Sequence, residues 1–189
     1  AIVDLTAPST PLANEDQTIL SVCNGEIYNG DELRKQLEAA GHRFRYGIDT
    51  EVLPHLYEEY GPALIERLDG MFAFAIWDAP RQRLVLGRDR AGEKPLYWSE
   101  QPDELIFGSE LRAVLAHPRV ARQLDPVALQ QFLLHDYFPA PATPIAAIRK
   151  LPAAHLLIHE RGRTSIKRYW DLADHYATAR RSALSFGAA

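Results

Sequence analysis

The chain has 189 residues, of which 47% are hydrophobic and 24% charged, and its formal net charge is -4. This composition is typical of a globular domain with one substantial core, and the negative charge argues against nucleic acid or a membrane surface as a partner. We expect no transmembrane segment, no signal peptide and, with a single cysteine, no internal disulfide, which together predict a cytoplasmic protein.

The first elements of the chain are predicted to be strands. Residues 1–5 indicate a short strand, and residues 18–23 indicate another, because apolar and β-branched residues alternate there. This second strand leads into Asn24 and Gly25. An Asn-Gly pair alone is typical of a turn, but at the end of a strand its amide and backbone N–H groups can also hold an oxyanion or a substrate carbonyl.

A helix is expected next, with Asn29 as its N-cap, Glu32 completing a capping box and Gly41 at its end. After a strand-like segment, a second helix is expected to start with Asp49 or Thr50 as its cap. Further helices are expected over residues 62–68, 110–116 and 125–134.

The remaining apolar segments predict strands that pair as hairpins. They cover residues 71–77, 83–88, 95–98, 105–107, 156–159 and 165–169. The segment 71–77 is apolar on both faces, which indicates a strand covered on both sides. This pattern favours stacked antiparallel sheets covered by helices.

Several segments resemble the glutaminase domain of asparagine synthetases, which are class II glutamine amidotransferases. The matching residues are 24–29, 47–51, 68–78, 88–98, 107–111, 148–152 and 168–171. The resemblance implies an α+β fold, the four-layer αββα fold of N-terminal-nucleophile hydrolases, here missing its first strands. It also implies that residues 1–170 form a partial type 2 glutamine amidotransferase domain, and that residues 171–189 are a tail leading towards an absent synthetase domain.

The resemblance also assigns site residues. Asn24 and the backbone N–H of Gly25 match the oxyanion-binding groups. The positions that match contacts to the glutamine substrate are Ile2, Val3, Glu26 and Asp49. Without the resemblance, Asp49 would be interpreted as a helix cap and the two apolar residues as ordinary core.

The nucleophile is not recognisable in the sequence. In the family it is a cysteine at the mature N-terminus, whereas residue 1 is alanine and the only methionine is Met71, so we expect a piece of a longer protein. The family arginine that binds the substrate carboxylate would precede Ala1. Cys23 ends an apolar strand and is interpreted as inert packing rather than as a catalyst.

We expect no metal site and no cofactor in this chain. The seven histidines are scattered, and the closest spaced candidates, His155 and His159, lack a third ligand. No phosphate-binding glycine loop occurs, so ATP and magnesium are expected only for the synthetase domain. The charged residues Asp89, Arg90 and Lys94 indicate either a solvated hairpin turn or, by resemblance, a structural or communicating loop near the domain junction.

These features predict an asparagine synthase (glutamine-hydrolysing)-like protein. The parent would hydrolyse glutamine and use the ammonia for ATP-dependent amidation of aspartate, and this chain alone would be inactive. The alternative is a degenerate, non-catalytic module with a scaffolding or partner-binding role, as in β-lactam synthetase; a separate chain carrying the nucleophile is a third option. The expected partners are glutamine and the synthetase domain. A homo-oligomer is also considered, because missing strands would expose sheet edges and apolar surface.

Overall fold

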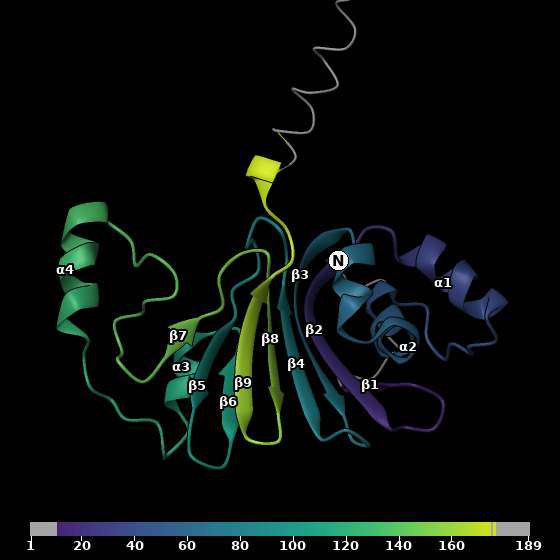
Figure 1. The fold of residues 1–189 in the computed structure, drawn as a ribbon, viewed down its shortest axis with the longest axis horizontal. Coiled ribbons are helices and arrows are strands. Elements are labelled where there is room, and N and C mark those ends of the chain that lie inside the picture. The colour runs from purple at the N-terminus through teal and green to yellow at the C-terminus, as the bar shows by residue number, and fades with distance from the viewer. Residues whose placement is uncertain (1–10, 175, 177–189) are drawn as a thin grey trace, which may run out of the picture.

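The computed structural model describes residues 11–174 and 176. Two antiparallel sheets lie face to face, with the order β1-β2-β3-β4-β8-β9 in the larger and β6-β5-β7 in the smaller (Figure 1). The strands are β1 (Leu12–Ala13), β2 (Ile19–Ile27), β3 (Gly70–Asp78), β4 (Arg83–Arg88), β5 (Tyr97–Glu100), β6 (Leu105–Gly108), β7 (Arg149–Lys150), β8 (His155–Glu160) and β9 (Arg163–Arg168). The helices are α1 (Gly30–Ala39), η1 (Asp49–Glu51), α2 (Val52–Tyr60), η2 (Gly61–Arg67), α3 (Leu111–Leu115) and α4 (Pro126–His135), of which η1 and η2 are 3-10 helices.

The largest hydrophobic core lies between α1, α2 and η2 and one face of the six-stranded sheet. Leu33 and Leu37 of α1 contribute to it because residues four apart share one helix face. From β3 come Phe72, Phe74 and Ile76, since alternate strand residues point to one side of a sheet. The helices therefore cover this face of the sheet.

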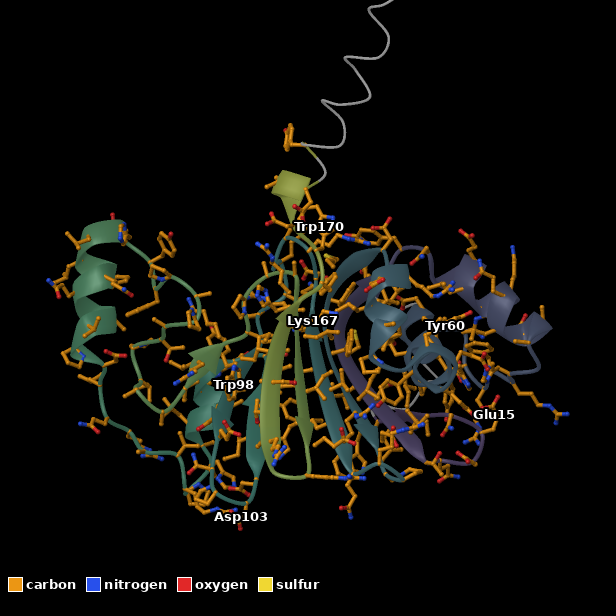
Figure 2. The ribbon with its side chains drawn as sticks, viewed as in Figure 1. Glu15, Tyr60, Trp98, Asp103, Lys167 and Trp170 are labelled. Carbon is orange, nitrogen blue, oxygen red and sulfur yellow. The ribbon has the colours of Figure 1, made fainter. Side chains whose placement is uncertain are left out.

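The opposite face of the same sheet packs against the smaller sheet. Ala73 and Ala75 of β3 and Leu157 of β8 contribute to this second core together with Trp98 of β5, which Figure 2 labels. On the far side of the smaller sheet, α3 packs through the fully buried Val114. The layers are thus helix, sheet, sheet and helix, which confirms the predicted αββα class. The strand expected over residues 1–5 lies outside the described residues.

The predicted end of the strand at Cys23 is wrong, and Asn24 and Gly25 form no turn, because β2 continues through both residues to Ile27. Gly25 lies opposite Phe72 of β3 in the antiparallel register. Its φ is +149°, and a Cβ there would lie 2.0 Å from the carbonyl oxygen of Met71. Glycine is needed because the backbones approach too closely for any side chain, and not because the chain reverses.

The capping box at Asn29 is also wrong. Helix α1 begins at the next residue, but Asn29 makes no side-chain cap hydrogen bond. Its amide instead donates to the carbonyl of Arg67 at 2.9 Å and accepts from the N–H of Asp69 at 3.0 Å. This tertiary contact holds the junction of β2 and α1 against the segment that enters β3.

Other expectations of local structure have mixed outcomes. Asp125 caps α4 as predicted, because its carboxylate accepts from the N–H groups of Val127 and Ala128. No side-chain cap forms at η1 or α2, and residues 43–46 are not a strand. The predicted hairpins β3–β4, β5–β6 and β8–β9 are confirmed. Among the described residues, none of the helices has both the length and the apolar character needed to cross a membrane.

Candidate functional site

A cleft of about 510 Å³ opens beside the second half of β2. Its walls come from β2 and the residue after it, from η1 and the residue before it, and from the loop between β4 and β5. The lining residues are Cys23, Asn24, Gly25, Glu26, Ile27, Tyr28, Ile48, Asp49, Thr50 and Lys94. Fold packing therefore brings the predicted residues of β2 together with Asp49, although they are more than twenty positions apart in the chain.

Asn24 and Gly25 present different polar groups to this cleft. The Asn24 side chain is exposed, and among the described residues its amide takes part in no hydrogen bond. It is therefore available to a ligand without breaking an existing contact. Gly25 has no side chain, so it contributes only backbone groups to the lining of the cleft, and it packs closely against β3.

Asp49 is held against the end of β2 and the start of α1. One carboxylate oxygen accepts a hydrogen bond from the N–H of Ile27 at 2.5 Å. A Cβ on Gly30 would lie 2.9 Å from the Cβ of Asp49, so the first residue of α1 must be small. The predicted role of Asp49 as a cap is not observed, and its carboxylate instead joins η1 to β2 at the cleft.

A buried ion pair fixes the loop that precedes Asp49. Glu51 is 2% exposed and accepts from the N–H groups of Arg45 and Tyr46. The guanidinium of Arg34 lies 3.5 Å from the same carboxylate and donates to the carbonyls of Tyr46 and Ile48. These contacts hold the backbone of the loop before η1. They therefore orient the carboxylate of Asp49, the first residue of η1.

The loop after β4 is built around a buried carboxylate. Asp89 is 1% exposed and accepts from the N–H groups of Phe72 at 3.3 Å, Glu93 at 2.9 Å and Lys94 at 3.0 Å. The solvated-turn interpretation is therefore wrong for Asp89. The guanidinium of Arg88 donates to three main-chain carbonyls and closes the same loop from the other side.

Lys94 is a site residue that the sequence reasoning did not assign. It is the cationic side chain of the cleft lining within the described part of the chain, and it faces the same space as Glu26 and Asp49. The only signal in the sequence was its presence in the matching segment 88–98. Its position follows from the buried carboxylate of Asp89, which binds the Lys94 backbone.

Cys23 lies at the edge of the cleft but is not a ready nucleophile. It is half-buried and packs against the larger core. Burial raises the pKa of the Cys23 thiol to about 12, with the nearby Asp49 carboxylate adding to the rise and Lys94 opposing it. At neutral pH the thiol stays protonated, and the thiolate is the nucleophilic form.

The other candidates from the sequence are not in this cleft. His155 contacts the carbonyl of Ala153 and His159 contacts the hydroxyl of Thr164, each through Nδ1. Ile2 and Val3 lie outside the described residues.

Comparisons with known proteins agree with the fold and with the resemblance found in the sequence. The model of the glutamine amidotransferase domain family matches residues 1–170. Asparagine synthetase [glutamine-hydrolyzing] 3 of Bacillus subtilis (strain 168) is 37% identical over 91% of this chain, and asparagine synthetase [glutamine-hydrolyzing] 1 of the same organism is 37% identical over 90%. The chain spans only 28% and 27% of these two relatives.

A solved structure shares the fold at lower identity. The glutamine phosphoribosylpyrophosphate (PRPP) amidotransferase from B. subtilis, complexed with ADP and GMP, superimposes with a TM-score of 0.58 and 21% identity. The match covers 87% of this chain and 32% of that chain. This likeness confirms the predicted N-terminal-nucleophile hydrolase fold, and the family match confirms the resemblance found in the sequence: the chain belongs to the glutamine amidotransferase domain family.

Proposed function

We propose that this domain binds glutamine in the cleft beside β2 and serves as the glutaminase unit of an asparagine synthetase-like enzyme. The observation that carries the proposal is the meeting of Asn24, Gly25, Glu26 and Asp49 in one cleft. The names of the similar proteins, glutamine-hydrolysing asparagine synthetases, support the choice of substrate. A purely scaffolding role is less well supported. It would not require the polar groups that line this cleft, and those groups are present.

The proposed roles follow from charge and exposure. The Asn24 amide and the Gly25 N–H stabilise the oxyanion that develops at the substrate amide, where one donor typically contributes about 3–4 kcal/mol to the transition state. The carboxylates of Glu26 and Asp49 bind the α-ammonium of glutamine. By resemblance, the backbone of Ile2 and Val3 completes the substrate contacts.

The proposal separates binding from turnover. Glutamine-amide hydrolysis by acyl transfer needs an attacking nucleophile, and the protonated Cys23 is the thiol that the described residues place near the cleft. We therefore expect the 189-residue chain to bind glutamine without hydrolysing it. In the parent enzyme, ammonia would pass to a synthetase domain, where ATP and magnesium support the amidation of aspartate.

Cellular location and assembly belong to the same proposal. A cytoplasmic protein that contacts neither membranes nor nucleic acid fits the single cysteine and the net charge of -4. Self-association through exposed apolar surface stays a prediction that gel filtration would check.

Titration calorimetry with L-glutamine on the 189-residue chain tests the binding site. Asp49→Asn keeps an acceptor for the Ile27 N–H but removes the charge that pairs with the substrate ammonium, so we expect about 10- to 100-fold weaker binding. Asp31→Asn, an exposed change on α1, is the matched control and should leave the affinity unchanged. Equal affinities for Asp49→Asn and the parent chain would refute the proposed site.

An ammonia-release assay on the same samples tests the second half of the proposal. We expect no glutamine-dependent ammonia above the rate in buffer. Sustained turnover by the parent chain would show that a nucleophile is present, and would overturn the separation of binding from hydrolysis without affecting the binding site.

A further inference from the structure

A second polar cluster lies on the helical side of the larger sheet, away from the glutamine cleft. Glu15 follows β1, His42 follows α1, and His55 and Glu58 lie three residues apart on α2. One ligand atom from each residue lies within 4.8 Å of the others. Figure 2 shows Glu15 beside the coil of α2. The cluster has no residue in common with the lining of the cleft beside β2.

His55 is the buried member of this cluster. Its side chain is 1% exposed, and neither ring nitrogen has a hydrogen-bond partner. Nδ1 lies 3.2 Å from a carboxylate oxygen of Glu15, but without the geometry of a hydrogen bond. A buried imidazole without a hydrogen bond is costly, and a cation on the Glu15 side would satisfy Nδ1.

His42 is oriented as metal-binding histidines usually are. Its Nε2 lies 3.1 Å from the carboxylate of Glu59, and its Nδ1 lies 3.3 Å from Glu15. When Nε2 carries the proton and donates to Glu59, the lone pair of Nδ1 faces the Glu15 carboxylate. A cation between the His42 Nδ1 and the Glu15 oxygen would stabilise both of these electron-rich atoms. Metal-binding histidines typically donate their other ring N–H to a carboxylate, as Nε2 would to Glu59.

The carboxylates of the cluster are also held in place. Glu58 accepts a hydrogen bond from the amide of Asn14 at 3.0 Å, and Asn14 is itself 1% exposed. Glu15 accepts from the N–H of Arg43 at 2.7 Å. A solvent-open cleft of about 470 Å³, lined by Glu15, His42 and Glu58 among others, gives an ion access to these groups.

We propose that Glu15, His42, His55 and Glu58 bind one zinc ion in a four-coordinate structural site. Tetrahedral zinc with bonds of about 2.0–2.1 Å places neighbouring ligand atoms about 3.3 Å apart. Nδ1 of His55 lies 3.2 Å from Oε2 of Glu15, and Nδ1 of His42 lies 3.3 Å from Oε1, so each carboxylate oxygen has this spacing to one of the two histidines. The full set, with one ligand atom from each residue, lies within 4.8 Å and would contract slightly around an ion. Two neutral imidazoles and two carboxylates also balance the charge of a divalent ion, and nitrogen donors favour zinc over magnesium or calcium.

Such an ion would join three separate segments, namely the β1–β2 turn, the residues after α1, and α2. It would therefore stabilise the packing of these segments on the larger sheet. This inference does not depend on the proposed glutaminase role, and its test measures metal binding rather than turnover.

The test uses the 189-residue chain without an affinity tag, freed of metal by a chelator that is then removed. Zinc is titrated against a chromophoric competitor, and thermal unfolding is followed with and without zinc. We expect one zinc ion per chain. At a zinc concentration about 100 times the dissociation constant, the melting temperature should rise by roughly 5–10 °C.

Matched variants locate the site. His42→Ala and Glu58→Gln should each weaken zinc binding by at least about 10-fold. His135→Ala and Glu38→Gln change an exposed histidine and an exposed glutamate elsewhere, and should bind zinc like the parent chain. His55→Gln should also lose binding, and the exposed change Glu58→Gln decides the question even if the substitution at the buried His55 impairs folding.

Three results would overturn the proposal. One is the absence of stoichiometric zinc binding by the parent chain, and another is unchanged affinity in both His42→Ala and Glu58→Gln. The third is tighter binding of manganese or magnesium than of zinc in the same competition assay.

Discussion

Gly25 illustrates how strongly single residues constrain the site. A Cβ at this position would lie 2.0 Å from the Met71 carbonyl oxygen and 2.6 Å from the Cα of Phe72, and the backbone φ of +149° is itself unfavourable for other residues. Gly25→Ala should therefore lower the free energy of unfolding by about 3 kcal/mol or more, measured by urea denaturation. Gly162→Ala is the control, because its φ of +72° carries strain but no atom lies within 4 Å. That variant should lose only about 1 kcal/mol. Equal losses would show that strain, rather than the approach of β3, determines the need for glycine.

Cys23 gives a second test at the residue scale. With its pKa raised to about 12, roughly one molecule in ten thousand carries the thiolate at pH 8, against about a quarter for a free thiol of pKa about 8.5. Iodoacetamide should therefore modify the folded chain on the order of 1,000-fold more slowly than the urea-unfolded chain. Since the chain has a single cysteine, mass spectrometry of the intact protein follows the reaction directly. Rapid alkylation of the folded chain would reveal an activated thiol and would reopen Cys23 as a nucleophile.

Among the elements of the fold, the loop after β4 is built around one side chain. The Asp89 carboxylate accepts from three main-chain N–H groups in a buried position. Asp89→Ala leaves those donors unpaired and should cost about 3–5 kcal/mol of unfolding free energy, whereas Asp89→Asn keeps an acceptor and should cost less. Asp103→Ala removes an exposed ion pair with Arg119 and should cost much less than either. Equal stability of the Asp89→Ala and Asp103→Ala variants in denaturant titrations would contradict the structural role of this loop.

The elements that could be predicted from the sequence are those governed by neighbouring residues. The β3–β4 and β8–β9 hairpins follow from apolar alternation around a turn, and the cap at Asp125 uses donors two and three residues away. Asn29 has the same capping chemistry, yet its amide binds Arg67 and Asp69 instead. That contact depends on where η2 and β3 lie in the fold, which local sequence does not encode.

On the scale of the whole molecule, the two sheets share one core and should unfold together. Leu157 of β8 is fully buried between them. Leu157→Ala should lower the stability by about 2–5 kcal/mol and shift the unfolding of both sheets equally. In a chain that also carries Trp77→Phe and Trp170→Phe, the fluorescence of Trp98, which lies in the same core, and far-UV circular dichroism should report the same midpoint. Leu133→Ala, at a position that is 82% exposed, should leave the midpoint nearly unchanged. Separate midpoints for the two probes would show that the sheets unfold independently.

The two sites differ in how far the sequence could predict them. The residues of the proposed glutamine site could be predicted because Asn24, Gly25 and Glu26 are consecutive, and because Asp49 lies in another matching segment. The cluster around His55 was missed, since its four ligands are contributed by three segments that only the packing of α1 and α2 brings together. The expectation of no metal site relied on close spacing in the sequence, and a tertiary cluster does not require it.

The hydrogen bonds of Asp89 have a consequence for position 94. They bind the backbone of that residue and leave its side chain to the cleft. Exchanging this side chain would therefore alter the electric field in the proposed glutamine site without changing the surrounding main chain. Variants at this one position would therefore change which amino acids the proposed site prefers, while the fold of the loop is retained.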